Sequence, residues 1–255
     1  MPREFQWSES KFRISRGVVR ASRNAAELSR SSRILADMVG EFYTRSIPEW
    51  ANGDLIDLGC GKAPLLGAYR EYCTSHVLAD WENSEHPNRL LDLIIDLNQP
   101  LSVIDSKTFD TVLLSDVLEH VREPKALVFE IARILRPGGA LLLNVPFAYW
   151  IHEAPHDYYR YTRYALEGFI QEAGLDLIEL RPLGGWPAVL ADLFSKVLNK
   201  FRMYLLVSII HSIFINLNKS SLGRRLVSAG SDRMPLGYAL VAVKRGESDS
   251  ALYKY

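Results

Sequence analysis

The sequence contains few cysteines and has no excess of charge. Among its 255 residues, Cys60 and Cys73 are the only cysteines, and 30 basic side chains balance 30 acidic ones. This excludes a disulfide-rich scaffold, and we expect a reducing, cytoplasmic location. The zero net charge provides no overall attraction to nucleic acid, so no nucleic-acid partner is expected.

Long apolar segments are also absent. Residues 1–30 are polar and rich in arginine, without the apolar stretch of a secretory signal. The apolar run over residues 203–217 is shorter than the ~20 residues that a helix needs to span a bilayer. No internal repeat appears, and a hydrophobic share of 48% is ordinary for a globular protein.

A short apolar segment followed by two glycines, residues 55–64, predicts a cofactor-binding turn. Residues 55–58 favour a buried strand, and a short helix is expected after the turn, up to about Tyr72. Gly59 and Gly61 allow the sharp turn between them because glycine tolerates positive φ. A strand, a glycine turn and a helix N-terminus bring a ligand close to bare backbone N–H groups.

The third glycine of the dinucleotide fingerprint is missing, because Ala63 and Pro64 stand where it should fall. Asp57 precedes the glycine pair, and a carboxylate there would repel a pyrophosphate. It would suit a cofactor with positive charge, such as the ammonium of S-adenosylmethionine. A nicotinamide-dependent enzyme is therefore disfavoured, and a purely structural turn is the alternative.

Strand and helix patterns alternate along the chain, which predicts a parallel, doubly wound sheet. After the first strand, strands are expected at residues 76–80, 91–97, 109–115, 140–145, 175–180 and 238–243. Helices are expected at residues 28–43, 124–135 and 163–173. Pro48 is expected in the link after the first helix, Gly138 and Gly139 are expected to cap the end of the second, and Thr162 the start of the third. Ligands in such sheets bind outside the carboxyl ends of the strands, here between residues 57–61 and 115–120.

Asp80 lies 19 residues beyond Gly61, at the end of the second predicted strand. An acidic residue at this position can accept hydrogen bonds from both hydroxyls of a ribose. Trp81 follows and is expected either beside an adenosine or as a packing residue.

Three runs resemble the small-molecule, type 11-like branch of the class I S-adenosylmethionine-dependent methyltransferases: DLGCG at residues 57–61, FDTVLLSDVLEHV at 109–121 and LRPGG at 135–139. The resemblance covers about residues 53–146. It implies a Rossmann-like, seven-stranded, mostly parallel sheet with an antiparallel last strand, and S-adenosylmethionine as cofactor. The residues that it implies in cofactor binding are Asp57, Gly59, Cys60, Gly61, Asp80, Trp81, Asp96, Leu97, Ser115, Asp116 and His120.

Residues 152–162, H-E-x-P-H-D-Y-Y-R-Y-T, resemble a segment of methyltransferases from bacterial surface-polysaccharide clusters, which implies a glycan acceptor. A hydroxyl nucleophile benefits from a general base. The catalytic candidates are His156 and His152, with Asp157 or Glu153 to orient an imidazole. The alternative is a loop whose tyrosines pack. No metal is expected, because Pro155 argues against a helix that would align the two histidines.

These features predict an O-methyltransferase acting on a sugar or another small-molecule hydroxyl. No N-P-P-[YF] run of the kind that marks many amino-methylating enzymes follows the fourth strand. Two alternatives stay open: a peripheral-membrane lipid or quinone methyltransferase, and a non-catalytic module that binds S-adenosylmethionine.

The chain divides into a basic, helical leader at residues 1–45, a cofactor-binding core at 46–183, an apolar helical insertion at 184–236, and the last strand and tail at 237–255. The leader is expected either as an arm for an anionic partner or as a solvated helix face. In the insertion, one apolar helical stripe is predicted from Leu190, Leu193, Phe194, Val197, Leu198 and Phe201. For residues 188–217, core packing, a lid, a homodimer contact and contact with the inner face of a membrane all stay open.

Overall fold

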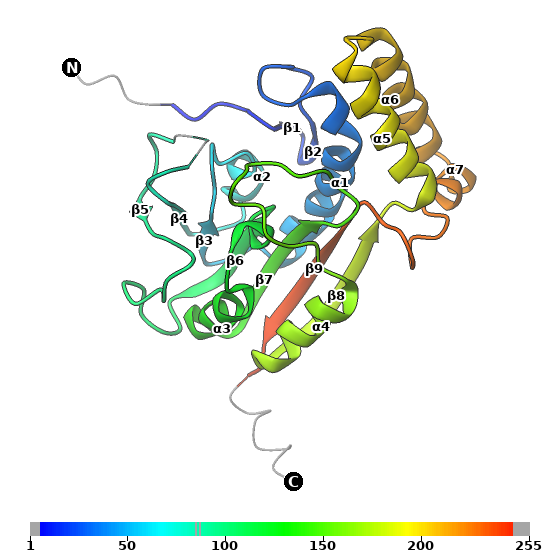
Figure 1. Ribbon diagram of the computed structural model, residues 1–255. Helices are drawn as coiled ribbons and strands as arrows, with labels where there is room; N and C mark the ends of the chain where they lie inside the picture. Colours follow the sequence, from blue (N-terminus) through cyan, green and yellow to red (C-terminus); the bar gives the residue numbers. More distant parts are fainter. Residues whose placement is uncertain (1–5, 85, 87, 247–255) are drawn as a thin grey trace, which may run out of the picture.

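A seven-stranded sheet forms the centre of the protein. Its strands are β3 (Asp54–Leu58), β4 (Ser75–Asp80), β5 (Leu93–Ile94), β6 (Phe109–Ser115), β7 (Leu135–Pro146), β8 (Leu175–Leu183) and β9 (Gly237–Lys244). Their order in the computed structural model is β5-β4-β3-β6-β7-β9-β8 (Figure 1). Neighbouring strands are parallel except β9, which runs antiparallel to both β7 and β8. The predicted fold class is therefore confirmed.

The structure describes residues 6–84, 86 and 88–246, so most of the predicted polar tail lies outside the described residues. The helices are α1 (Arg33–Trp50), α2 (Leu66–Tyr69), α3 (Pro124–Ile134), α4 (Arg163–Glu172), α5 (Trp186–Lys200), α6 (Tyr204–Asn218) and α7 (Ser221–Val227). Two apolar clusters cover the sheet, one containing residues of α1 and α5 and the other residues of α3 and α4. Strands covered on both faces explain the nearly continuous apolar runs in the sequence.

Most predicted elements are found with small shifts, and three differ more. The strand expected at residues 91–97 is reduced to Leu93–Ile94. Pro48, expected in a linker, lies in the last turn of α1, where a missing N–H removes only one helical hydrogen bond. Glycine capping was expected after α3, but Leu135 is already extended and opens β7 directly. The cap at Thr162 is as predicted, since its hydroxyl accepts a bond from the Ala165 N–H (3.3 Å).

The N-terminal leader is folded onto the core as a hairpin of β1 (Phe12–Ser15) and β2 (Val18–Ala21). The Val19 N–H donates to the Thr44 hydroxyl on α1 (2.9 Å). Gly40 permits this contact, because an added Cβ would lie 2.7 Å from the Val19 carbonyl oxygen. The described part of the leader thus packs on α1, while the basic side chains of Arg13, Arg16 and Arg20 stay exposed, and residue 45, where its boundary was expected, lies inside α1.

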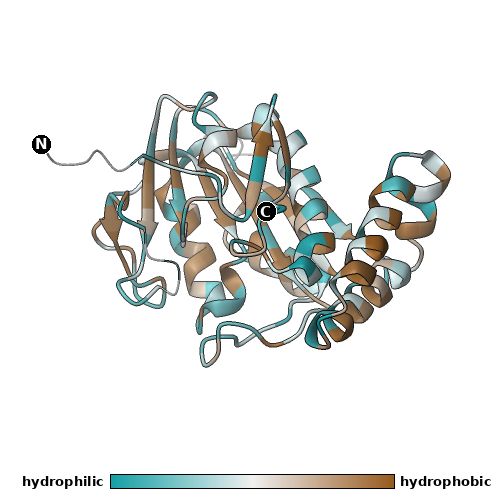
Figure 2. Ribbon diagram, turned by 90° about the horizontal axis from the view of Figure 1, so that it is seen from above, coloured by the Kyte–Doolittle hydropathy of each residue, from teal (hydrophilic) through white to brown (hydrophobic). Residues whose placement is uncertain are grey.

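Helices α5, α6 and α7 form the insertion between β8 and β9, and they project from one end of the molecule (Figure 1). The predicted apolar stripe of α5 is 48–69% exposed at Leu190, Leu193, Phe194, Val197 and Phe201. Core packing, one of the open alternatives for residues 188–217, therefore holds for Ala188, Val189 and Phe214 but not for this stripe. Figure 2 shows the brown, apolar segments on these helices. Within the described ranges, the helices are all too short or too polar to cross a bilayer.

Candidate active site

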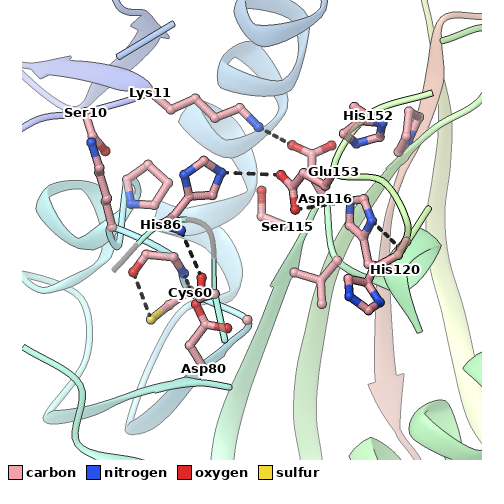
Figure 3. Close-up of a pocket in the computed structure, with 18 of the residues that line it drawn as sticks. Ser10, Lys11, Cys60, Asp80, His86, Ser115, Asp116, His120, His152 and Glu153 are labelled. Atoms are coloured by element: carbon pink, nitrogen blue, oxygen red, sulfur yellow. Dashed lines mark hydrogen bonds and ion pairs between the residues drawn. The ribbon is translucent and has the colours of Figure 1, made fainter. Parts of the chain in front are cut away.

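A cavity of about 540 Å³ opens at the carboxyl ends of β3, β4, β6 and β7 (Figure 3). Both predicted edges line it, the glycine turn on one side and Ser115, Asp116 and His120 on the other. Helix α1 adds the apolar side chains of Leu35 and Val39. The site therefore lies at the predicted switch in strand order.

The glycine turn holds its backbone against the neighbouring strand. Gly59 and Gly61 have φ values of +67° and +52°. The N–H groups of Gly59 and Cys60 both donate to the Ala79 carbonyl, at 2.8 and 3.1 Å. An added Cβ on Gly59 would lie 2.7 Å from the Val117 side chain, so only glycine fits between the two edges of the cavity.

Asp80 closes the turn from the end of β4. Its carboxylate accepts bonds from the N–H groups of Gly61 (3.0 Å) and Trp81 (2.8 Å), one on each oxygen. Each oxygen keeps lone pairs for further donors, as binding to ribose hydroxyls requires. Asp96 and Leu97 also line the cavity, and Asp96 is fixed by the Asn98 N–H (2.9 Å). The predicted nucleoside-binding residues are thus brought together.

Asp57 is placed differently from the expectation. It is buried beneath the turn, is not among the residues lining the cavity, and accepts a hydrogen bond from the Tyr69 hydroxyl (3.1 Å). Burial raises its pKa to about 7. Direct pairing of this carboxylate with a cofactor ammonium is therefore not what the structure shows, and a role of Asp57 in binding stays a prediction.

Lys11 is a cavity residue that the sequence analysis missed. It reaches from the leader to the Asp116 carboxylate at the end of β6 (2.5 Å), as Figure 3 shows. Burial lowers the pKa of Lys11, but the charge and hydrogen bond of Asp116, together with the charges of Tyr149 and Glu119, outweigh it and leave the pKa above its usual value. Asn144 holds the other carboxylate oxygen of Asp116 (2.7 Å). A basic leader was noted, but a single lysine has no local signal for a partner 105 positions away.

The two candidate histidines lie on the cavity wall with different partners. The Nδ1 of His156 lies 3.1 Å from the Tyr158 hydroxyl rather than beside either of the acids expected to orient an imidazole. Asp157 contacts His152 instead, where its Oδ2 accepts the backbone N–H (2.9 Å) and lies 3.3 Å from the imidazole Nδ1. Asp157 is itself away from the cavity and anchors the loop.

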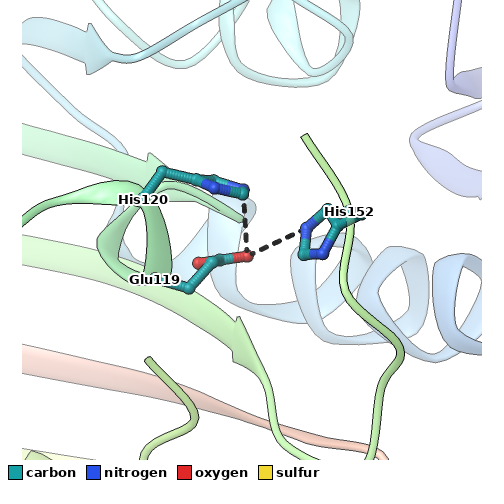
Figure 4. Close-up of side chains that lie close together, drawn as sticks. All are labelled: Glu119, His120 and His152. Carbon is teal, nitrogen blue, oxygen red and sulfur yellow. Dashed lines mark ion pairs between the residues drawn. The ribbon is translucent and has the colours of Figure 1, made fainter. Parts of the chain in front are cut away.

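Glu119 is a second residue that the sequence analysis missed, although it lies in the FDTVLLSDVLEHV run at residues 109–121. Its side chain is fully buried, and its Oε1 lies 3.7 Å from the His152 Nε2 and 3.8 Å from the His120 Nε2 (Figure 4). Burial raises the pKa of Glu119. For His152, burial lowers the pKa, but the nearby Glu119 raises it to above its usual value. These three side chains form what we call the Glu–His cluster.

Comparison with known sequences indicates the family of this chain. A family model described as a methyltransferase domain matches residues 26–180. Ubiquinone biosynthesis O-methyltransferase from Parvibaculum lavamentivorans is 33% identical over 91 residues, which cover 29% of this chain and 36% of the relative. The enzyme of that name from Xanthomonas euvesicatoria is 29% identical over 111 residues, covering 40% and 46%. The chain thus spans less than half the length of these curated relatives.

Solved structures share the fold at low identity. An S-adenosylmethionine-dependent methyltransferase from Archaeoglobus fulgidus matches with a TM-score of 0.54 and 16% identity, covering 84% of this chain and 97% of that one. The [4+2]-cyclase SpnF matches with a TM-score of 0.53 and 16% identity, covering 84% and 82%. The sheet order, the glycine turn and the family match over more than half of the chain agree. The chain belongs to the class I S-adenosylmethionine-dependent methyltransferases.

Proposed function

We propose that this enzyme is an O-methyltransferase that acts on the hydroxyl of a sugar or another small molecule. Bound S-adenosylmethionine would supply a methyl group on a sulfonium, and a nucleophile would attack this methyl carbon in line with the departing sulfur. The cavity fits that cofactor, since Asp80 keeps acceptor capacity beside the glycine turn and Gly59 leaves the space that a side chain would fill. Holding nucleophile and methyl in line is worth on the order of 7–11 kcal/mol.

The observation that carries this proposal is the set of imidazoles on the cavity wall facing the glycine turn: His120, His152 and His156. A hydroxyl must lose its proton as it attacks carbon, and a neutral imidazole accepts a proton near neutral pH. We choose His156 as the acceptor, because it meets a tyrosine hydroxyl rather than a carboxylate. His152 is held between Glu119 and Asp157 and is less free to move a proton.

The test separates cofactor binding from transfer. We expect His156→Ala to bind S-adenosylhomocysteine as tightly as the wild type in calorimetry. Its turnover should fall by about 10²–10⁴, the usual worth of a general base. Methyl transfer from labelled cofactor is measured on sugar hydroxyls, on phenols and, as a control, on amines. Transfer to amines alone, or full turnover by His156→Ala, would contradict the proposal.

A second candidate, a methyltransferase for lipid or quinone acceptors that works at a membrane surface, is supported by the outer face of the insertion. Helices α5–α7 expose large apolar side chains along their whole length. Those exposed by more than 45% are Trp186, Leu190, Leu193, Phe194, Val197, Leu205, Ile213, Leu222 and Leu226. Contiguous exposed apolar surface of this kind marks an interaction site.

The charges around this face favour an anionic lipid surface as the occupant. Between residues 186 and 227 the sole acidic residue is Asp192, and it is buried. The exposed ionic side chains in this segment are all cationic: Lys200, Arg202, Lys219, Arg224 and Arg225. Cations beside an apolar helix face promote binding at the headgroup level of anionic membranes. The curated relatives bear the name of quinone-pathway enzymes, which agrees with a membrane-borne acceptor.

Vesicle flotation tests this candidate. We expect wild-type protein to float with vesicles of phosphatidylcholine and phosphatidylglycerol and to remain below vesicles of phosphatidylcholine alone. Phe194→Asp should abolish flotation, whereas Phe129→Asp, on an exposed position of α3, should leave it unchanged. If wild-type protein floats with neither kind of vesicle, and light scattering shows a dimer that Phe194→Asp dissociates, the face instead binds a second copy of the chain.

A further inference from the structure

We propose that Glu119, His120 and His152 bind a divalent transition-metal ion at the wall of the cavity. The three residues come from two segments: Glu119 and His120 follow β6, and His152 lies in the loop after β7. One ligand atom from each lies within 4.8 Å of the other two. Figure 4 shows both imidazoles directed at the same carboxylate oxygen.

The burial of Glu119 without partners is the first reason. Among the described residues, neither of its carboxylate oxygens has a hydrogen-bond partner, although the side chain is fully buried. A buried carboxylate without hydrogen bonds is strongly unfavourable unless a positive charge compensates for it. The Nε2 of His120 also lacks a hydrogen-bond partner in the described part of the chain. An ion between these atoms would satisfy all of them.

The orientation of the imidazoles is the second, independent reason. The Nδ1 of His120 lies 2.8 Å from the His156 carbonyl oxygen, to which only a protonated Nδ1 can donate. This leaves the Nε2 of His120, the atom nearer Glu119, with its lone pair. Metal-binding histidines are typically held in this way, with the second nitrogen donating to a carbonyl or carboxylate. In His152 the Nδ1 lies 3.3 Å from the Asp157 carboxylate but makes no hydrogen bond among the described residues, and its Nε2 is the atom nearer Glu119.

The ligand set selects the kind of ion. One carboxylate and two imidazoles suit Zn²⁺, Mn²⁺ or Fe²⁺, whereas Ca²⁺ requires six to eight oxygen ligands. The Glu119 Oε1 lies 3.7 and 3.8 Å from the two Nε2 atoms. Two ligand atoms that each bind one ion at about 2.1 Å lie slightly closer to each other than this, so small side-chain rotations would bring the three atoms to binding distance. Glu153 lies 3.9 Å from the His120 Nε2 but is not one of the three residues whose ligand atoms all lie within 4.8 Å of one another.

The role of the ion rests on the proposed O-methyltransferase function. A hydroxyl that approaches the ion from the cavity would become more acidic, because a bound cation stabilises the oxygen anion. In the transfer step the O–H bond breaks with its proton passing to His156, and the O–CH₃ bond forms. The methyl–sulfur bond breaks with its electron pair remaining on sulfur, which produces neutral S-adenosylhomocysteine.

Metal binding is measured directly on the full-length protein after treatment with a chelator. We expect one Mn²⁺ per chain in calorimetry and in the loss of the free Mn²⁺ signal by electron paramagnetic resonance. Glu119→Gln and His152→Ala should each weaken binding at least a hundredfold. His76→Ala removes an exposed imidazole on β4 and should bind as the wild type does. Thermal melts of each variant without metal show whether it is folded, and added Mn²⁺ should raise the Tm of the wild type and of His76→Ala only.

Two results would overturn the metal site: wild-type protein that binds neither Mn²⁺ nor Zn²⁺ stoichiometrically, or binding that survives in folded Glu119→Gln and His152→Ala. The outcome is independent of the proposed function, since it needs no acceptor. Metal binding together with no transfer to any hydroxyl would keep the site and reject the O-methyltransferase. Methyl transfer to a hydroxyl that persists in excess chelator, in a protein that binds no metal, would keep the O-methyltransferase and reject the metal site.

Discussion

The ammonium of Lys196 lies 3.9 Å from the centre of the Tyr149 ring. Lys196 belongs to α5 of the insertion, whereas Tyr149 follows β7 and lines the cavity. The Tyr149 hydroxyl donates to Ser32 (2.9 Å), and its ring meets that of His152 at a centroid distance of 5.3 Å. The inner side of the insertion is therefore in contact with the loop that bears the candidate acceptor site.

The first prediction concerns the ion pair of Lys196 with Asp192, which lies one turn earlier on α5. Both side chains of this pair are almost fully buried. Burial shifts the pKa of each towards its neutral form, and the partner's charge opposes that shift. Removing one partner of such a pair typically costs about 3–5 kcal/mol, whereas removing both costs much less. We expect Lys196→Met to lose that much stability in urea unfolding, and Asp192→Leu combined with Lys196→Met to recover most of it. Equal losses in the single and double variants would contradict this.

The second prediction concerns Gly59. Alanine there must adopt φ of +67°, and its Cβ would press on Val117 across the cavity edge. The left-handed conformation costs about 1–2 kcal/mol, and the collision adds to it. We expect Gly59→Ala to weaken S-adenosylhomocysteine binding more than tenfold in calorimetry. Gly138→Ala is the matched control, because φ is +81° there but open space surrounds the added Cβ.

Rescue distinguishes the collision from the strain. Val117→Ala in the Gly59→Ala background removes the two methyl groups nearest the new Cβ and should restore part of the affinity. If Gly138→Ala weakened cofactor binding as much as Gly59→Ala, the loss would come from general destabilisation rather than from the turn.

The sheet was predictable because its strands are local features. Buried strands such as β9 are nearly continuous apolar runs, and the glycines that follow β3 mark a turn wherever they occur. For α5, apolar spacing identified a helix but not its inner face. That face contains the ion pair of Asp192 and Lys196, while the larger apolar stripe faces outward. A prediction from hydrophobic periodicity assumes that the apolar stripe of a helix faces the core, and here tertiary contacts override that assumption.

The site was predictable where its residues follow strand ends, as Asp80 and Ser115 do. It was not predictable where distant segments meet. Glu119 and His152 are separated by a helix and a strand, and Lys11 lies in a leader without a motif. Asp157 was expected to orient one of the two imidazoles, and only the course of the loop shows that it contacts His152 rather than its neighbour His156. Such pairings depend on the tertiary course of the chain.

The third prediction concerns the pH dependence of stability caused by Asp57. Its pKa is about 7 in the folded protein because of burial, against an ordinary value of 3.8. Below about pH 4 the group is protonated in both states. Between pH 4 and 7 the unfolded chain releases the proton that the folded chain retains, so stability falls as pH rises; above pH 7 no further change follows.

From pH 5 to pH 8 this corresponds to a loss on the order of 2–3 kcal/mol in the free energy of unfolding. We expect Asp57→Asn to be more stable than the wild type at pH 8 and to lack this component, measured by urea unfolding at both values. An identical pH dependence in variant and wild type would contradict the assignment. Cofactor affinity measured on the same variant tests whether Asp57 contributes to binding from beneath the turn.

The fourth prediction concerns the charge that Lys11 places in the cavity. S-adenosylmethionine carries one more positive charge than S-adenosylhomocysteine, so a nearby ammonium disfavours the former relative to the latter. Lys11→Met removes that ammonium and leaves the Asp116 carboxylate facing the cavity. At charge separations of several ångströms in a partly solvated site, the expected effect is about two- to tenfold. We expect the ratio of the Kd of S-adenosylmethionine to that of S-adenosylhomocysteine to fall by this factor in calorimetry.

Lys62→Met is the matched control for this variant. Lys62 lies at the rim of the cavity, where its ammonium is more exposed and pairs with Glu27 (2.9 Å). Screening by solvent and salt should leave the ratio of the two Kd values nearly unchanged in that variant. Because the Lys11 effect arises from charge, raising the salt concentration from 0.05 to 0.5 M should reduce it. A ratio that moves equally in both variants, or that is insensitive to salt, would mean that Lys11 acts through the packing of the leader rather than through its charge.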